Sequence, residues 1–135
     1  MRLVLDTNVY IAAFLNKGLA SDVLRLGQRK KVELFVSETI LKELRNKLKS
    51  KFNLEKKAVK GFEELILQVA ELVSPKKTLK VIKNDPADNR IIECAVEAKA
   101  DLIVSMDKHL VRLKKYRKIG IIHSKTLTWI IPRFF

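Results

Sequence analysis

The pattern that decides the fold first occurs in residues 2–8, which read Arg2-Leu3-Val4-Leu5-Asp6-Thr7-Asn8. A short apolar run rich in branched side chains predicts a buried β-strand, and this run ends abruptly in polar residues that favour turns and helix caps. The pattern recurs at residues 102–107, which read Leu102-Ile103-Val104-Ser105-Met106-Asp107. Each segment therefore predicts a strand that is followed at once by an aspartate.

The residues between and after these two segments show helical and strand patterns in alternation. Helical spacing of apolar residues is present at 21–26, after the capping residue Ser37, over 55–72, and after Asp85-Pro86, where an N-cap precedes proline at the first helical position. Further strands are predicted at 33–36, 79–82 and 119–122, and short helices after Asp107 and Ser124. Continuous apolar strands separated by helices indicate a parallel sheet buried on both faces. We therefore expect an α/β fold, a three-layer α/β/α sandwich with a central, mainly parallel sheet.

Length and composition indicate one domain. The chain has 135 residues, 47% of them apolar, which is enough for a proper core, and neither repeats nor Gly- or Pro-rich linkers interrupt it. Its apolar runs are far shorter than the roughly 20 residues that span a bilayer, and Asp6 interrupts the N-terminus where a signal peptide would continue. We expect a cytoplasmic protein without a membrane anchor, in which the single cysteine, Cys94, is a buried small hydrophobe.

The charge balance indicates a polyanionic partner. Lysine and arginine number 28 against 15 aspartates and glutamates, which gives a formal net charge of +13. The bases are clustered, for example at 29–31 and 114–118. A lysine-rich solvated surface is the alternative, but adaptation to heat would add glutamates as well, and here the excess is one-sided. The sequence therefore favours nucleic acid as the partner.

Candidate site residues are the acids that end strands or lie beside apolar helix faces. Ligands of parallel sheets bind outside the carboxyl ends of the strands, where we expect Asp6 and Asp107. Glu43 follows Ile40 by three residues, which places it beside the apolar stripe of its helix, where an acid needs a partner or a metal. Asp88 is a further candidate. Asp6, Asp88 and Asp107 each have an alternative role as ordinary helix-capping residues.

Several converging carboxylates repel one another, and at neutral pH a divalent cation relieves this repulsion. Oxygen ligands suit Mg²⁺ or Mn²⁺, whereas zinc favours His or Cys, and His109, His123 and Cys94 lack ligand spacing. Magnesium leaves room for phosphate oxygens. Together with the basic surface, the acids indicate a nuclease in which the cation activates a water and stabilises the charge on the phosphate.

Four segments taken together resemble the PIN domain, and most closely its VapC-like toxin branch. Their order and spacing agree from residue 1 to about residue 124: Leu3-Val4-Leu5-Asp6-Thr7-Asn8-Val9, Ser37 through Leu44, Asp85-Pro86-Ala87-Asp88-Asn89, and Ile103-Val104-Ser105-Met106-Asp107. The resemblance implies that residues 1–135 form a single PIN-like nuclease domain. It further implies a Mg²⁺- or Mn²⁺-dependent endoribonuclease, the toxin of a toxin-antitoxin pair, which cleaves RNA phosphodiesters with a metal-activated water.

The resemblance also assigns roles to individual residues. The acids that would surround the ions are those at the matching positions, Asp6, Glu43, Asp88 and Asp107. Asn8 and Ser105 match supporting polar positions, and Thr7 would lie nearby at the helix start. His109 stands where similar proteins often carry a further aspartate, and we expect it to be an exposed helix residue. Such toxins usually pair with a small antitoxin and often form homodimers. The apolar C-terminal residues would either join a dimer interface or pack on the chain's own sheet: Trp129, Ile130, Ile131, Phe134 and Phe135.

Three other functions compete with a ribonuclease. A catalytically silent RNA-binding or partner-binding module would keep the basic surface without using the acids. A phosphatase of the HAD type places a nucleophilic aspartate at a strand end and a second acid two residues later; here Asn8 stands at that second position and cannot serve as a general acid or base. A DNA structure-specific nuclease shares the metal site but usually adds a long arch or further domains.

Overall fold

The computed structural model describes residues 1–15, 19–83 and 85–130 of the chain. The described residues form a six-stranded sheet in the order β3-β2-β1-β4-β6-β5. All neighbouring strands run parallel except β5, which pairs antiparallel with β6. The strands are β1 (Arg2–Leu5), β2 (Glu33–Ser37), β3 (Ala70–Val73), β4 (Leu102–Ser105), β5 (Lys115–Tyr116) and β6 (Ile119–His123). The expected α/β fold with a mainly parallel sheet is confirmed.

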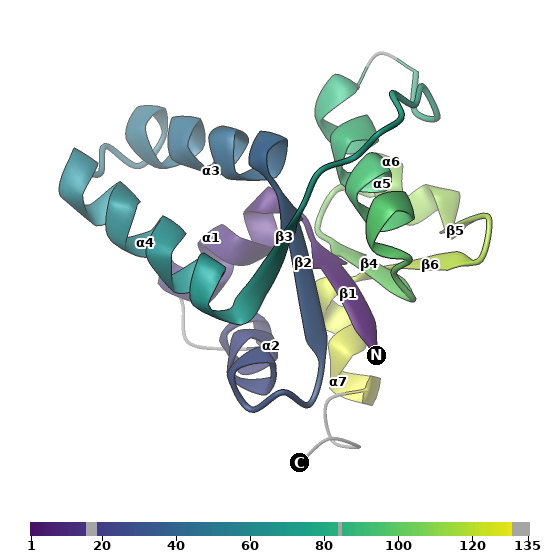
Figure 1. Cartoon of the computed structure of the whole chain (residues 1–135), viewed down its shortest axis with the longest axis horizontal. Helices are drawn as coiled ribbons and strands as arrows, with labels where there is room; N and C mark the ends of the chain where they lie inside the picture. The colour runs from purple at the N-terminus through teal and green to yellow at the C-terminus, as the bar shows by residue number, and fades with distance from the viewer. Residues whose placement is uncertain (16–18, 84, 131–135) are drawn as a thin grey trace.

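Helices cover both faces of the sheet and complete the three layers. They are α1 (Thr7–Leu15), α2 (Leu19–Gln28), α3 (Glu38–Ser50), α4 (Lys56–Val69), α5 (Pro86–Ala98), α6 (Lys108–Leu113) and α7 (Leu127–Ile130), the last preceded by a 3₁₀ turn at Ser124–Thr126. Figure 1 shows α1 to α4 on one side of the sheet and α5 with α6 on the other. The chain moves across the sheet in one direction from β1 to β3 and in the other direction from β3 to β6. Right-handed crossovers that run in opposite directions place their helices on opposite faces.

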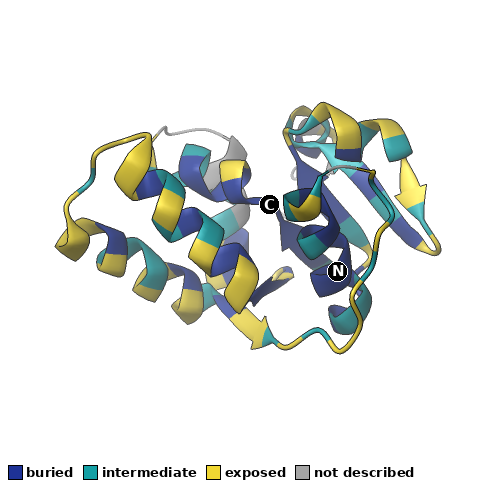
Figure 2. Ribbon diagram, turned by 90° about the horizontal axis from the view of Figure 1, so that it is seen from above, coloured by how far each residue is buried: buried dark blue, intermediate teal, exposed yellow. Residues whose placement is uncertain are grey.

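The core is centred on β1, which lies between β2 and β4. Val4 pairs with Phe35 on one side and with Ile103 on the other. Val4 and Leu5 are completely buried, as the dark blue centre of Figure 2 illustrates, because helices cover both faces at this point. Cys94 is also buried, as expected for a small hydrophobe. Within the described residues, the helices are too short or too polar to cross a membrane.

The third strand was predicted at residues 79–82, and this prediction is wrong. The helix expected over 55–72 ends at Val69, and the chain turns directly into the edge strand β3, which pairs with β2 through Ala70 and Leu34. Glu71 and Leu72 on this strand are exposed, so the edge strand lacks the continuous burial that a central strand shows. The apolar residues of β3 happen to continue the helical spacing of α4, which is why the helix was predicted to extend to residue 72.

Residues 79–82 instead form an irregular segment whose backbone is bonded by side chains of α5, among which Asn89 makes the most contacts. The Asn89 amide oxygen accepts hydrogen bonds from the backbone N–H groups of Val81 and Ile82 at 2.9 and 2.8 Å, and its nitrogen donates to the Ile82 carbonyl at 2.8 Å. Asn89 thus satisfies the backbone groups that a sheet would otherwise pair. The apolar side chains that suggested a strand pack against the core without joining the sheet.

Two details at the C-terminal side also differ from expectation. The short strand β5 was not predicted, and its two residues give no periodic signal. The final helical segment is capped by His123, whose Nδ1 accepts a hydrogen bond from the Lys125 N–H at 3.1 Å, and not by Ser124. Trp129 is 78% exposed, whereas Ile131, Phe134 and Phe135 lie outside the described residues.

Candidate active site

The carboxyl ends of β1 and β4 are adjacent because these strands pair in parallel, with Leu5 opposite Val104. A cleft of about 220 Å³ opens at this edge of the sheet. It is lined by all four predicted acids together with several polar and apolar side chains: Asp6, Thr7, Asn8, Glu43, Lys47, Asp85, Ala87, Asp88, Ile91 and Asp107. The tertiary structure thus brings together acids from four separate segments of the chain.

Asp6 is buried and both of its carboxylate oxygens accept hydrogen bonds. Oδ1 accepts from the Val9 N–H at 3.0 Å and so caps the start of α1, while Oδ2 accepts from the Met106 N–H at 3.1 Å and from the Ser105 hydroxyl. Burial raises the pKa of Asp6, and these hydrogen bonds, followed by the charge of Lys47, oppose the increase. Asp6 therefore caps α1 and also lines the cleft.

Ser105 links the two strand ends. While its hydroxyl donates to Asp6, its oxygen accepts a hydrogen bond from the Asp107 N–H at 2.9 Å. Ser105 is completely buried, so this pair of hydrogen bonds is shielded from water. The structure thus places Ser105 between Asp6 and Asp107, in contact with both.

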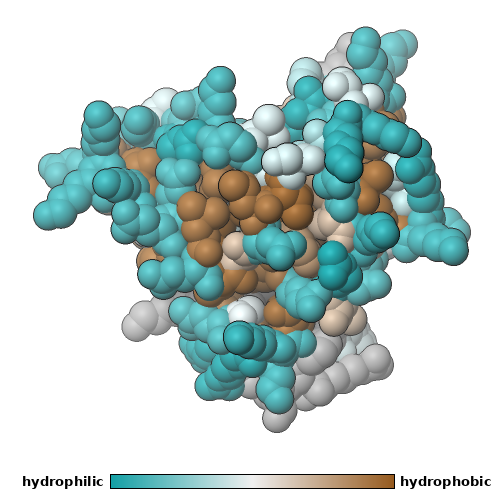
Figure 3. Space-filling model, viewed as in Figure 1, coloured by the Kyte–Doolittle hydropathy of each residue, from teal (hydrophilic) through white to brown (hydrophobic). Residues whose placement is uncertain are grey.

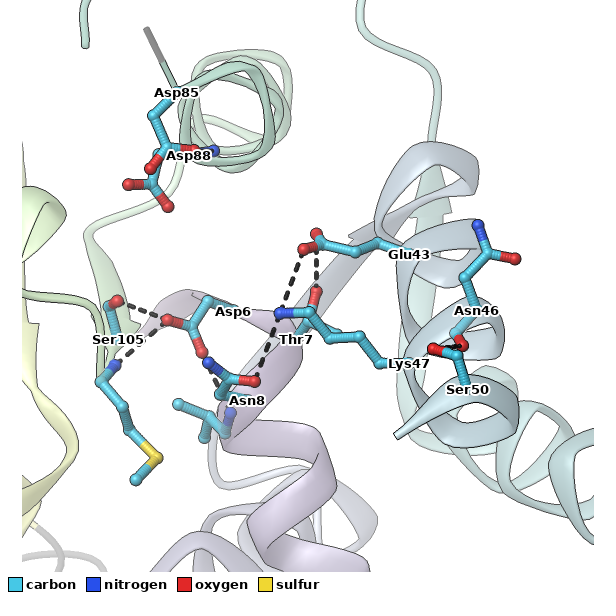
Figure 4. Close-up of polar contacts among 12 residues, drawn as sticks. Asp6, Thr7, Asn8, Glu43, Asn46, Lys47, Ser50, Asp85, Asp88 and Ser105 are labelled. Carbon is cyan, nitrogen blue, oxygen red and sulfur yellow. Dashed lines mark hydrogen bonds and ion pairs between the residues drawn. The ribbon is translucent and has the colours of Figure 1, made fainter. Parts of the chain in front are cut away.

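Glu43 reaches the cleft from α3, whose first turn is capped by the buried Ser37 through a hydrogen bond from the Ile40 N–H at 3.3 Å. Glu43 Oε2 accepts a hydrogen bond from the Thr7 hydroxyl at 3.0 Å. Its Oε1 lies 3.2 Å from the ammonium nitrogen of Lys47, which also donates to the Asn8 side-chain oxygen at 3.3 Å. These contacts, drawn in Figure 4, hold Glu43 toward the cleft and supply the partner that an acid beside an apolar stripe requires.

On the other side of the cleft, Asp85, Asp88 and Asp107 form a compact cluster in which one carboxylate oxygen from each lies within 4.8 Å of the others. Two of the three are also helix caps. Asp85 accepts from the Asp88 N–H at 3.2 Å at the start of α5, and Asp107 accepts from the N–H groups of His109 and Leu110 at 2.7 and 3.4 Å at the start of α6. Two helix N-termini, which favour negative charge, therefore position the cluster.

Asp88 is the least satisfied of these acids. It is 6% exposed, and its Oδ2 is buried without a hydrogen-bond partner among the described residues. Burial, followed by the hydrogen bond with Asp85 and the charges of Asp107 and Asp85, raises the pKa of Asp88 to about 8. The cluster thus lacks positive charge, and a divalent cation would supply both the charge and the missing partner for Oδ2.

The chemistry of the donors fits Mg²⁺ or Mn²⁺ and does not fit zinc. Among the described residues that line the cleft, the polar side chains offer carboxylate, hydroxyl and amide oxygens, and Lys47 is the exception. His109 is exposed and contacts Asp107 through its backbone N–H, His123 caps the 3₁₀ turn, and Cys94 is buried in the core. None of these three residues lines the described cleft.

Two cleft residues were not selected from the sequence. Asp85 was interpreted only as a helix cap, although its position three residues before Asp88 places both acids at one helix start. Lys47 was not singled out from the many basic residues of the chain, although its spacing of four residues from Glu43 places the two side chains on one face of α3. Its low side-chain exposure and its contact with Asn8 on another helix distinguish it from the exposed lysines of the same segment.

A model of the PIN domain matches residues 2–109 of the chain. The chain belongs to the PIN domain family. The matched region contains every acid of the cleft, so the PIN-domain resemblance of the four segments is confirmed.

Among solved structures, the PIN domain described here is similar to a chain in the crystal structure of VapBC2 from Rickettsia felis, bound to a DNA fragment from their promoter. The TM-score is 0.65 at 16% sequence identity, and the similarity covers 91% of this chain and 98% of that chain. At this identity the likeness concerns the fold alone. No curated protein matches the sequence.

Proposed function

We propose that this PIN domain is a metal-dependent endoribonuclease and the toxin of a toxin-antitoxin pair. The observation that carries the proposal is the buried, unpartnered Oδ2 of Asp88 within a cluster of three carboxylates at an open cleft. Such a cluster fits a divalent cation, and oxygen ligands favour Mg²⁺ or Mn²⁺. The formal net charge of +13 favours a polyanionic substrate.

The residues of the cleft have distinct proposed roles. Asp85, Asp88 and Asp107 would hold the cation, with Asp6 and Glu43 facing them across the cleft. When bound, the cation supplies a Lewis acid that activates a water and stabilises charge on the phosphate. Ser105 keeps the Asp6 carboxylate in place, and Thr7 keeps that of Glu43 in place, so that the acids are positioned before substrate binds. Asn8 contributes its amide oxygen to the same wall.

An antitoxin partner is supported by the similarity in fold to a VapBC2 chain and by the surface of the molecule. Figure 3 shows hydrophobic side chains gathered in the middle of one face and framed by hydrophilic ones. On the edge strand β3, Leu72 is 50% exposed. Apolar patches rimmed by polar residues are typical of protein interaction sites. In this proposal residues 1–135 act as one cytoplasmic nuclease domain.

A homodimer is the second proposed assembly. It rests on Trp129, which is 78% exposed near the C-terminal end of the described chain. A large exposed aromatic side chain is common at interfaces. Light scattering at tens of micromolar protein tests this assembly: the mass of a dimer would support it, and the mass of a monomer would contradict it.

The nuclease is tested with end-labelled single-stranded RNA. Wild type, Asp107→Asn and Glu64→Gln are incubated with Mn²⁺ and, separately, with EDTA. Glu64 is exposed on α4, so its variant removes one negative charge away from the cleft. We expect cleavage by wild type and Glu64→Gln only with Mn²⁺, and none by Asp107→Asn. Cleavage in EDTA, or cleavage by Asp107→Asn at the wild-type rate, would contradict the proposal.

A catalytically silent RNA-binding module is the second candidate function. It is favoured by the capping hydrogen bonds of Asp6, Asp85 and Asp107, which give each of these acids a structural role. Tight RNA binding that is unchanged in Asp107→Asn, with no cleavage of a varied RNA pool, would support this module over the nuclease. A phosphatase is less well supported, because Asn8 accepts a hydrogen bond from Lys47 and offers no acid for proton transfer.

A further inference from the structure

The wall of the cleft formed by α1 and α3 carries a fixed positive charge. The Lys47 ammonium lies 3.2 Å from Glu43 Oε1 and donates a hydrogen bond to Asn8 Oδ1 at 3.3 Å. Lys47 is the one lysine, arginine or histidine among the described residues that line the cleft. Figure 4 shows its nitrogen between the side chains of these two partners and near Asp6.

On the opposite wall, the described residues that line the cleft include no basic side chain. Asp85, Asp88 and Asp107 lie together there, and Asp88 keeps a buried oxygen without a partner among the described residues. The two groups of acids therefore differ in their surroundings. Glu43 and Asp6 lie near the ammonium of Lys47, whereas no basic side chain of the described residues is paired with the three aspartates. A second divalent ion between Glu43 and Asp6 would meet the positive charge of Lys47.

Glu43 and Lys47 could be an ordinary helix ion pair, since they are four residues apart. Such pairs are normally exposed and contribute only about 0.3–0.5 kcal/mol. Lys47 differs in two respects: its side chain is only 23% exposed, and its nitrogen contacts α1 as well as its own helix. An ammonium group has three donors, and these two contacts leave one for a ligand that enters the cleft.

We propose that Lys47 is a phosphate-binding residue that takes the place of a second divalent cation in this cleft. Its remaining N–H contacts a non-bridging oxygen of the substrate phosphate, while a single ion binds at Asp85, Asp88 and Asp107. Positive charge on both sides of the cleft would then stabilise the negative charge that develops on the phosphate. This inference rests on the proposed nuclease function and assigns the number of ions and a substrate contact to that site.

The number of ions is tested without RNA, by titrating the protein with Mn²⁺ and following bound ion by electron paramagnetic resonance. Wild type is compared with Lys47→Gln, with Lys47→Arg, and with Lys49→Gln, which removes an exposed charge from the same helix. We expect one bound ion in wild type, Lys47→Arg and Lys49→Gln, and a second, spin-coupled ion in Lys47→Gln. Two ions in wild type, or no second ion in Lys47→Gln, would overturn the inference.

The substrate contact is tested by RNA cleavage at saturating Mn²⁺. Lys47→Gln should lower kcat by about 10²-fold, the usual loss for a donor aimed at developing charge, and Lys47→Arg should restore most of it. Lys49→Gln should stay within about twofold of wild type. Wild-type kcat in Lys47→Gln would overturn the contact. Failure of wild type to cleave any RNA would contradict the nuclease itself, whereas a two-ion wild type that cleaves RNA contradicts this inference alone.

Discussion

The Ser105 hydroxyl at the end of β4 donates a hydrogen bond to Oδ2 of Asp6 at the end of β1. Both residues are buried, and they lie 99 positions apart in the chain. The same hydroxyl oxygen accepts from the Asp107 N–H. One small side chain thus fixes the relative position of two acids of the cleft. We therefore expect substitution of Ser105 to disturb both Asp6 and Asp107.

Replacing Ser105 with Ala should destabilise the protein by about 1–3 kcal/mol, because a buried carboxylate oxygen and a backbone N–H each lose a partner. Urea unfolding of the metal-free protein measures this loss. Ser50→Ala is the matched control, since the Ser50 hydroxyl bonds the Asn46 carbonyl on an exposed helix end. Equal stabilities of the two variants would show that the hydrogen bond to Asp6 contributes nothing measurable.

The metal-free protein should lose stability as the pH rises from about 4 to about 8. The pKa of Asp88 is about 8 in the folded chain and 3.8 in its reference state, so the folded protein holds a proton that the unfolded chain releases. This stabilisation is complete below the unfolded pKa and is lost as the pH rises through the folded pKa. Burial also raises the pKa of Asp6, so this carboxyl likewise contributes stability that is lost as the pH rises.

Melting temperatures in EDTA between pH 4 and pH 8 measure this trend. Asp88→Asn should remove most of it, because the amide carries no titrating charge, while Glu64→Gln on the exposed face of α4 should keep it. A wild-type melting temperature that rises steadily over this range would contradict the assigned protonation of Asp88.

Adding Mn²⁺ at pH 7.5 should raise the melting temperature of the wild type. An ion that binds only the folded state at 100 times its Kd stabilises it by about 2.7 kcal/mol. Asp107→Asn should lose this increase, since it removes one of the three clustered carboxylates. Calorimetry with and without Mn²⁺ compares the two proteins, and an equal increase in both would place the ion elsewhere.

Thr7→Val should slow RNA cleavage by about tenfold or more while the fold is kept. Thr7 is buried, and its hydroxyl holds Glu43 Oε2 toward the cleft; valine fills the same space without this donor. Single-turnover cleavage of labelled RNA with Mn²⁺ measures the change. Thr78→Val, at an exposed position, should cleave like wild type. An unaltered rate in Thr7→Val would mean that the position of Glu43 does not limit the reaction.

Leu5→Ala should cost roughly 2–5 kcal/mol of unfolding free energy, because Leu5 is completely buried in the central strand β1 and its removal leaves a cavity. Leu72→Ala on the edge strand, where the side chain is 50% exposed, should change stability far less. Urea titration of both variants tests this contrast, and similar losses would place the centre of the core elsewhere.

Most of the fold could be predicted from periodicity because the central strands are buried on both faces. Residues 2–5, 33–37 and 102–105 are apolar runs bounded by polar caps, and each is a strand of the parallel sheet. The edge strand Ala70–Val73 could not be predicted in this way, since two of its four residues are exposed and it follows a helix without a turn. Segment 79–82 had the composition of a strand, but Asn89 satisfies its backbone groups instead.

By itself, the sequence determined the acids Asp6, Glu43, Asp88 and Asp107 as candidates, because each has a local reason to be unusual: a strand end, an apolar helix face or a helix start. Only the tertiary structure decided that Asp85 joins Asp88 and Asp107, and that Lys47 compensates Glu43 across from them. The physical reason is that the residues of the cleft are far apart in the sequence. Local patterns specify the direction of a side chain along its own helix or strand, whereas the charge balance of a cleft depends on which helices and strands the sheet order brings together.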